Sequence, residues 1–162
     1  MLRVGIITIS DKGAIGERED KSGQLIMDML RPLSADVVSY KVLPDEKEQI
    51  QQELLRLADE LDLDLVLTTG GTGLSPRDVT PEATHEILHK SVPGIAEAMR
   101  WHSLQKTPYA MLSRAVCGIR GRSLIVNLPG SPKAVAECLQ IVMPALPHAI
   151  SKLRGDMSEC AR

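Results

Sequence analysis

The chain has almost no aromatic side chains. Its 162 residues contain no Phe, one Trp and two Tyr, although 43% of them are hydrophobic. The core must therefore be built from aliphatic side chains and Met, and the aromatic faces on which single-stranded nucleic acids stack are missing. A positive field is missing too, because the formal net charge is -2 and supplies little to hold a polyanion. We expect no nucleic-acid partner.

Long apolar runs and paired cysteines are also lacking. The apolar run 4–9 is much shorter than the roughly 20 residues that span a bilayer, and it has neither the charged segment nor the cleavage site of a signal peptide. We therefore expect a cytoplasmic protein with no membrane partner. Cys117, Cys138 and Cys160 are an odd number at wide spacing, which fits neither a disulfide framework nor a CxxC metal site. We interpret them as reduced thiols.

Short apolar runs alternate with segments of helical periodicity. The runs predict strands at 4–9, 38–42, 63–67 and 123–128, and the periodic segments predict helices at 25–33, 50–61, 80–89, 95–102 and 133–143. Thr80 is expected to cap its helix. Strands that alternate with helices imply right-handed crossovers and a mostly parallel sheet covered on both faces. We expect an α/β fold in which residues 1–162 form a single domain and 156–162 a loose tail.

The sharpest local feature is the glycine-rich stretch 69–78, which directly follows a predicted buried strand. Its three glycines among four residues allow backbone N–H groups to approach an anion. However, Gly73 is followed by Leu74 where a P-loop has lysine, and Pro76 stands where the dinucleotide fingerprint has its third glycine. Neither phosphate-loop type matches, and a tight turn without a ligand is the alternative.

Charged side chains stand beside the glycines and at other strand ends. Arg77 carries a guanidinium suited to phosphate, and Asp78 a carboxylate able to hold Mg²⁺. Asp45 ends a different strand, so it could meet Asp78 over the sheet and share a metal that bridges phosphate oxygens. The alternative for Asp45 is a helix cap, and Ser10 and Asp11 carry the same ambiguity. Together these residue types suggest nucleotide chemistry.

The segment 127–133 leaves another predicted strand. It supplies an amide, a glycine, a hydroxyl and a helix start, which together can receive a phosphate or the edge of a heterocycle. A plain turn with an N-cap would look much the same.

The segment 85–89 matches the HExxH pattern of zinc proteases, with two imidazoles at helical spacing. The extended form of that pattern fails, because Val92 and Ile95 occupy the places of its glycine and third histidine. We interpret His85 and His89 as exposed helix residues.

Five segments carry a resemblance to a known family: 9–11, 43–46, 68–84, 112–114 and 127–133. With these segments in this order, the chain resembles the molybdopterin adenylyltransferase family of molybdenum cofactor biosynthesis, which is related to molybdopterin-binding domains. The resemblance implies a three-layer α/β/α sandwich, commonly a homotrimer or a dimer of trimers. It also implies Mg²⁺-dependent transfer of AMP from ATP to the terminal phosphate of molybdopterin, with release of pyrophosphate. A partner protein for molybdenum insertion would act on the product.

The resemblance also assigns residues. Asp45 and Asp78 match the two aspartates on which the family relies for catalysis, and we expect them to hold Mg²⁺ against the ATP phosphates. The matching substrate-binding positions are Ser10, Asp11, Thr69, Gly70, Gly71, Thr72, Gly73, Arg77, Ser113, Asn127, Gly130 and Ser131. Ser131 stands where some members carry another small or polar residue. The alternatives are a non-catalytic molybdopterin-binding carrier or interaction domain, and a metal-dependent phosphate hydrolase on the same scaffold.

Overall fold

The sheet of the predicted α/β fold is present in the computed structural model, which describes residues 1–158. Within these residues six strands form one sheet in the order β2-β1-β3-β6-β5-β4. The strands are β1 (Leu2–Ile9), β2 (Ala35–Leu43), β3 (Leu65–Thr69), β4 (Lys90–Ser91), β5 (Cys117–Arg120) and β6 (Ser123–Leu128). β1, β2, β3 and β6 run parallel, whereas β5 pairs antiparallel with both β6 and β4. The mostly parallel sheet is confirmed.

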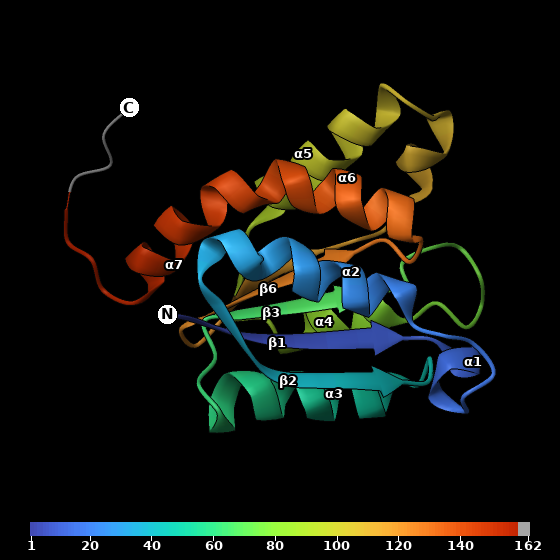
Figure 1. Ribbon diagram of the computed structural model, residues 1–162, viewed down its shortest axis with the longest axis horizontal. Coiled ribbons are helices and arrows are strands. Elements are labelled where there is room, and N and C mark those ends of the chain that lie inside the picture. The colour runs from blue at the N-terminus through green and yellow to red at the C-terminus, as the bar shows by residue number, and fades with distance from the viewer. Residues whose placement is uncertain (159–162) are drawn as a thin grey trace.

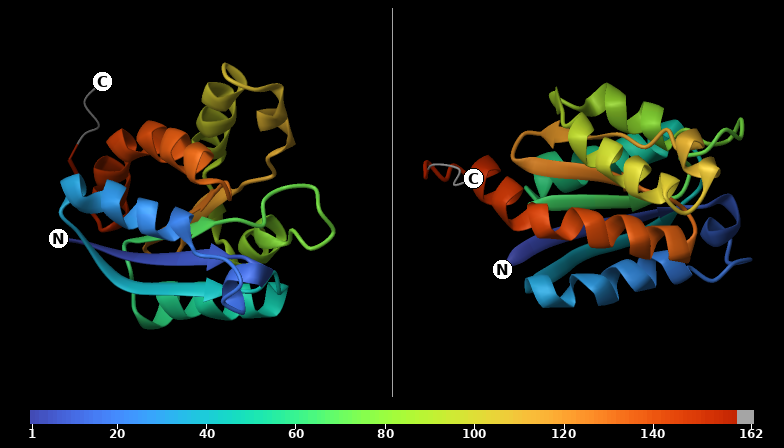
Figure 2. Two further views of the ribbon diagram at one scale, coloured as in Figure 1. Left: turned by 45° about the vertical axis from the view of Figure 1, so that its right-hand side comes forward. Right: turned by 90° about the horizontal axis from the view of Figure 1, so that it is seen from above.

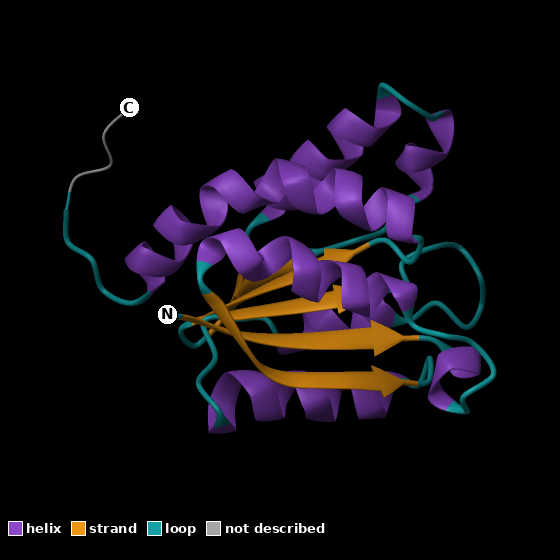
Figure 3. Ribbon diagram, viewed as in Figure 1, coloured by secondary structure: helices purple, strands orange, loops and turns teal. Residues whose placement is uncertain are grey.

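Helices cover both faces of the sheet (Figures 1 and 3). They are α1 (Asp11–Ala14), α2 (Lys21–Leu30), α3 (Lys47–Leu55), α4 (Thr80–Ile87), α5 (Pro93–Leu104), α6 (Pro132–Val142) and α7 (Leu146–Leu153). Short irregular turns η1 (Arg31–Leu33), η2 (Arg56–Glu60), η3 (Pro108–Leu112) and η4 (Met143–Ala145) extend or join them. α2, α5, α6 and α7 lie on one face, and α3 and α4 on the other. This is the expected three-layer α/β/α sandwich.

Two apolar layers result from the alternation of side chains along each strand. In β3, Leu65 and Leu67 pack with α2, α5 and α6, while Val66 between them packs with α3 and α4. All three are fully buried. Because both faces of the sheet are covered, a strand reads as a continuous apolar run rather than an alternating one. This explains why the central strands were recognisable in the sequence.

The elements that the sequence did not predict are short or lie at the edge. β4 has two exposed residues, and β5 joins β6 through a turn at Gly121, whose φ is +55. The short α1, the turn η3 and α7 were not predicted either. The predicted helix 80–89 ends at Ile87, and α5 begins at Pro93 rather than at 95 because proline is well tolerated in the first helical turn.

The C-terminal helical run lies on the sheet. Among the described residues, Pro132–Leu153 is long and apolar enough, at a mean hydropathy of 1.2, to pass a length-and-composition test for a membrane span. Val135, Leu139 and Leu146 from this run are fully buried in the core of the domain. In the predicted tail 156–162, Asp156 accepts a hydrogen bond from Ser151 Oγ at 2.8 Å; residues 159–162 lie outside the described part.

Candidate active site

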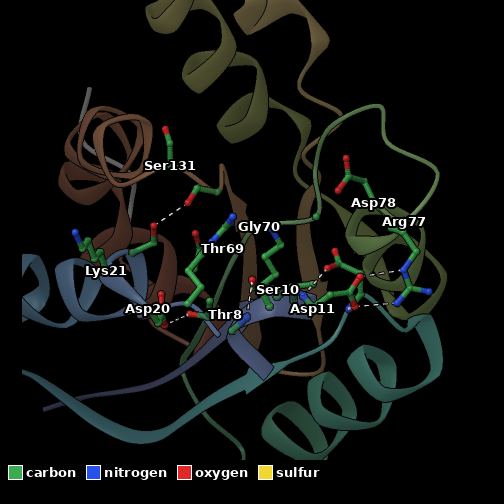
Figure 4. A pocket seen from close by; sticks show the side chains of 18 of the residues that line it. Thr8, Ser10, Asp11, Asp20, Lys21, Thr69, Gly70, Arg77, Asp78 and Ser131 are labelled. Atoms are coloured by element: carbon green, nitrogen blue, oxygen red, sulfur yellow. Dashed lines mark hydrogen bonds and ion pairs between the residues drawn. The ribbon is translucent and has the colours of Figure 1, made fainter. Parts of the chain in front are cut away.

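A cavity of about 980 Å³ opens at the carboxyl ends of the parallel strands (Figure 4). Residues after four strands line it: Ser10 and Asp11 after β1, Asp45 after β2, Gly70 and Gly71 after β3, and Gly130 and Ser131 after β6. Its centre is the point where the strand order reverses, because β1 crosses over to β2 on one side while β3 lies on the other. Open α/β sheets bind their ligands at this position.

Asp11 and Asp45 hold the ends of β1 and β2 together. The Asp11 N–H donates to Asp45 Oδ2 at 3.1 Å, and the Asp45 N–H donates to Asp11 Oδ1 at 3.0 Å. Asp45 therefore does not cap α3, whose N-cap residue is Glu46. Ser10, in contrast, does cap a helix, since its Oγ accepts a hydrogen bond from the N–H of Gly13 in α1.

Arg77 reaches back from the glycine-rich loop to this pair (Figure 4). Its Nε and Nη2 donate to the two carboxylate oxygens of Asp11 at 3.0 and 2.8 Å, and Nη2 also meets Glu46 Oε1 at 2.9 Å. The guanidinium lowers the pKa of Asp11. These donors are engaged with carboxylates, so a phosphate at Arg77 would have to compete with Asp11 and Glu46.

Asp78 lines the same cavity as Asp45. Its Oδ2 accepts a hydrogen bond from the Ser75 N–H at 2.9 Å. Burial raises the pKa of Asp45, and the negative charges of Asp11 and Asp78 raise it further. The two predicted carboxylates thus share one cavity and lie close enough to interact electrostatically.

The glycine-rich loop begins in a left-handed conformation, with φ of +95 at Gly70 and +66 at Gly71. A Cβ at Gly70 would overlap the backbone oxygen of Ile9 in β1, so the close approach of β1 and the loop requires glycine. Thr80 Oγ1 donates to the Gly70 carbonyl at 3.0 Å. The expected cap at Thr80 is wrong: Val79 is the N-cap residue, and the Thr80 hydroxyl holds the loop instead.

A second cavity of about 300 Å³ lies on the other side of this loop, between α5, η3 and α6. Three predicted substrate-binding residues, Thr72, Gly73 and Ser113, line this second cavity. Apolar side chains such as Met99 and Leu112 contribute much of its wall. The glycine-rich loop therefore separates two cavities, with Gly70 and Gly71 facing the first.

Asn127 and Thr69 differ in how they relate to the cavities. Asn127 is fully buried, and its Nδ2 donates to Thr68 and Thr84 Oγ1 at 2.9 and 3.0 Å, while its Oδ1 accepts from the Val116 N–H at 3.2 Å. The amide thus joins β6 to β3, α4 and the segment before β5, beneath the site. Thr69 lines the first cavity and donates from Oγ1 to the Pro129 carbonyl at 2.7 Å.

The start of α2 also lines the first cavity, although it was not among the predicted site residues. Asp20 caps this helix by accepting from the Gly23 N–H at 2.9 Å, and it accepts further hydrogen bonds from the hydroxyls of Thr8 and Tyr40. Burial, with help from Asp20, raises the pKa of Tyr40 to about 12. An aspartate just before the periodic segment 25–33 is an N-cap signal that could have placed this helix start.

His85 and His89 do not form a zinc-binding pair on one helix. α4 ends at Ile87, and His89 Nδ1 accepts a hydrogen bond from the Gly121 N–H at 3.0 Å. The intervening Glu86 pairs with Lys47.

An open α/β sheet with glycines and carboxylates around a cavity at its switch point is typical of proteins that bind phosphorylated ligands. The chain belongs to the molybdopterin-binding domain family: residues 5–148 match the family model described as "Probable molybdopterin binding domain". This confirms the resemblance seen in the sequence.

Similar proteins cover nearly the whole chain. A molybdopterin adenylyltransferase of Helicobacter pylori is 42% identical over 157 residues, which are 96% of this chain and 89% of that protein. The molybdopterin adenylyltransferase of Escherichia coli K12 is 39% identical over 174 residues, covering 99% of this chain and 89% of that protein. The crystal structure of the molybdopterin biosynthesis enzyme MoaB from Thermus thermophilus has a TM-score of 0.91 at 54% identity, covering 96% and 98% of the two chains.

Proposed function

We propose that this protein transfers AMP from ATP to the terminal phosphate of molybdopterin in molybdenum cofactor biosynthesis. The observation that carries the proposal is that Asp45, after β2, and Asp78, at the end of the glycine-rich loop, line one cavity. The two adenylyltransferases, 42% and 39% identical over most of their length, support it. An oxygen of the molybdopterin phosphate attacks the α-phosphorus of ATP, the bond from that phosphorus to the bridging oxygen breaks, and pyrophosphate leaves.

The first cavity suits the triphosphate. Backbone N–H groups of a glycine-rich loop and of the helix starts beside it favour negative charge. The substrate-binding residues that line this cavity are Ser10, Asp11, Thr69, Gly70, Gly71, Arg77, Gly130 and Ser131. Asn127 supports them from within the core rather than by contact.

The donor set of the cavity fits Mg²⁺. Asp45 and Asp78 would hold the ion, which usually takes one or two carboxylates and completes its shell with substrate phosphates and water. Within residues 1–158 no group of three or more acidic, histidine or cysteine side chains is arranged to hold a metal, so a site shared with the substrate is the form that fits. The raised pKa of Asp45 reflects burial and then an excess of negative charge, which a cation would relieve. The ion would neutralise charge on the phosphate oxygens.

The second cavity suits the pterin. Flat heterocycles bind in mostly apolar pockets with a few polar groups that fix their orientation, and Ser103 and Ser113 supply hydroxyls there. Thr72, Gly73 and Ser113 would contact this substrate. Because the loop separates the two cavities, the phosphate of a pterin in the second cavity would lie at the edge of the loop. There it would face the α-phosphorus of ATP held in the first cavity.

The test is transfer of labelled AMP from α-labelled ATP to molybdopterin with Mg²⁺. We expect Asp78→Asn to lower kcat by about 100-fold or more, since it removes preorganised charge at the phosphates. Asp36→Asn is the matched control, because Asp36 is an exposed aspartate near the start of β2, and it should keep wild-type rates. Pterin binding without product in the wild type would support a carrier instead, and free nucleoside phosphates would support a hydrolase.

The proposal extends to the assembly and its surroundings. A homotrimer or a dimer of trimers would bury apolar side chains that are exposed in the single chain on α5 and η3, namely Trp101, Tyr109, Met111 and Leu112. We place the protein in the cytoplasm and expect a molybdenum-insertion partner to receive its product. Sedimentation equilibrium of the wild type tests the assembly, and a monomer at micromolar concentration would contradict it.

A further inference from the structure

Arg114 spans the base of the loop segment that carries Asp78. Its Nε donates to the Gly73 carbonyl and its Nη2 to the Asp78 carbonyl, both at 2.8 Å. Its Nη1 pairs with Glu82, and its backbone N–H donates to the Thr72 carbonyl at 3.0 Å. One side chain therefore holds both ends of the segment 73–78.

Apart from Arg114, the side chain that ties this segment to the domain is Arg77, which bonds to Asp11 and Glu46 near the far end of the segment. The segment projects from the sheet as an open loop between β3 and α4 (Figure 2), and Leu74 at its start is 63% exposed. Its internal hydrogen bonds join Ser75 to Asp78, so they shape the segment without anchoring it to the domain. The planar guanidinium of Arg114 presents donors in a fixed geometry, so it fixes the distance between the Gly73 and Asp78 carbonyls at the two ends of the segment. This constrains where the Asp78 carboxylate lies.

Arg114 is itself held firmly. Arg100 Nη1, from α5, donates to the carbonyls of Ser113 and Ala115 at 3.3 and 2.9 Å, on either side of Arg114. The side chain thus extends from an anchored backbone across the loop. Arg114 also lies between the two cavities. It follows Ser113 and bonds to Gly73, which both line the second cavity, and it bonds to Asp78, which lines the first.

We propose that Arg114 is a positioning residue, which sets the Asp78 carboxylate by clamping the carbonyls of Gly73 and Asp78. The inference rests on the proposed function in assigning Asp78 to Mg²⁺ and the ATP phosphates. A residue with this role affects kcat and the Mg²⁺ requirement. The affinity for ATP changes little, since Gly70 and Gly71 are held separately by hydrogen bonds to the Leu128 carbonyl and to Thr80.

The decisive variant is Arg114→Lys, which keeps the charge but offers one compact ammonium that cannot reproduce the two-carbonyl fork. We expect kcat to fall about 10- to 100-fold, because small misplacements of a reacting group cost that much. The half-saturating Mg²⁺ concentration should rise, with KM for ATP within about twofold of wild type. Arg114→Ala should behave likewise and recover part of its kcat when millimolar guanidinium is added; if Arg114→Ala does not fold, Arg114→Lys decides.

Glu82→Gln is the matched control. It breaks the ion pair to Arg114 but leaves both bonds to the loop, so its kcat and Mg²⁺ dependence should match those of the wild type. Hydrogen exchange of residues 74–78 is a readout independent of activity, and it should be faster in Arg114→Lys than in Glu82→Gln. Unchanged kcat and unchanged exchange in Arg114→Lys would overturn the clamp. A wild type that transfers no AMP would overturn the proposed function instead, and exchange would still decide the clamp.

Discussion

Asp45 lies in an environment that disfavours its own charge. Burial raises its pKa, and the nearby carboxylates of Asp11 and Asp78 add to the rise. Folding therefore favours the protonated form. The charged form costs stability at any pH above the unfolded pKa of about 3.9, and the cost is complete above the raised folded pKa. A residue that binds a cation can be expected to carry such a penalty, since function and stability often conflict at active sites.

Asp45→Asn should therefore stabilise the ligand-free protein at pH 7 while abolishing AMP transfer. Asn keeps an oxygen that can accept from the Asp11 N–H and removes the charge. The stability advantage over the wild type should shrink as pH falls through the folded pKa of Asp45. Urea unfolding of both proteins between pH 4 and 8 measures this difference in stability. The interval runs from about a normal carboxyl pKa to several units above it. Lower stability of Asp45→Asn at pH 7 would show that the carboxylate is needed for structure.

Asn127 is the residue whose predicted role the structure changes most. Asn127→Ala would leave the part-buried N–H of Val116 and the buried hydroxyls of Thr68 and Thr84 without their present partner. We expect a loss of about 2 kcal/mol or more in the free energy of unfolding, since each buried unsatisfied group costs about 1–3 kcal/mol. The folded fraction should keep its KM for ATP. If stability is unchanged and KM rises instead, Asn127 contacts substrate, as the sequence alone suggested.

The glycine-rich loop depends on a close approach that only its tertiary setting reveals. Gly70 and Gly121 both have positive φ, +95 and +55, so alanine at either position costs roughly 1–2 kcal/mol in backbone strain. An added Cβ has nothing within 4 Å at Gly121 but meets the Ile9 backbone oxygen at Gly70. The ends of β1 and β3 cannot approach as closely with a side chain between them.

Gly70→Ala should therefore destabilise the protein by about 1–3 kcal/mol more than Gly121→Ala, the usual cost of forcing extra atoms into a packed site. It should also slow AMP transfer, because the displaced strand ends carry Ser10 and the start of the loop. Thermal unfolding and the transfer assay on both variants test this. Equal losses of stability in the two variants would mean that the loop moves away from Ile9 without an energetic penalty.

The two apolar layers of the whole domain control access to its thiols. Cys117 in β5 and Cys138 in α6 are 2% and 5% exposed. Burial raises the pKa of both, to about 12 for Cys117. Because the thiolate is the reactive form, both should be slow to alkylate in the native protein, with Cys138 faster since it lines the second cavity.

This order is measured by mass spectrometry after iodoacetamide treatment in a Cys160→Ser background. Cys117 should react only through global opening, so its rate should follow the stability of the domain as urea is added. Molybdopterin should protect Cys138 without protecting Cys117 to the same degree. Faster alkylation of Cys117 than of Cys138 would contradict this account of the core.

The central sheet was readable from the chain because its strands are buried on both faces. Leu65, Val66 and Leu67 form an unbroken apolar run for that reason, and the polar residues after such runs meet at one edge of the sheet. The position of Asp45 in the cavity follows from the same rule, whereas Asp78 reaches the cavity from the end of the loop between β3 and α4. Local patterning was therefore enough to predict the fold class and to place the site at the carboxyl ends of the parallel strands.

Contacts between distant segments settled the rest. The sequence near Asn127 does not indicate its hydrogen bonds to Thr68 and Thr84. Ser113 likewise reaches the second cavity only through the packing of α5 and η3. Arg114 meets the glycine-rich loop across 36 residues of chain. Periodicity and motifs report which residues face a core or end a strand, but hydrogen-bond partners far apart in the chain are chosen by packing. For that physical reason the second cavity and the Arg114 clamp became visible only once the chain was folded.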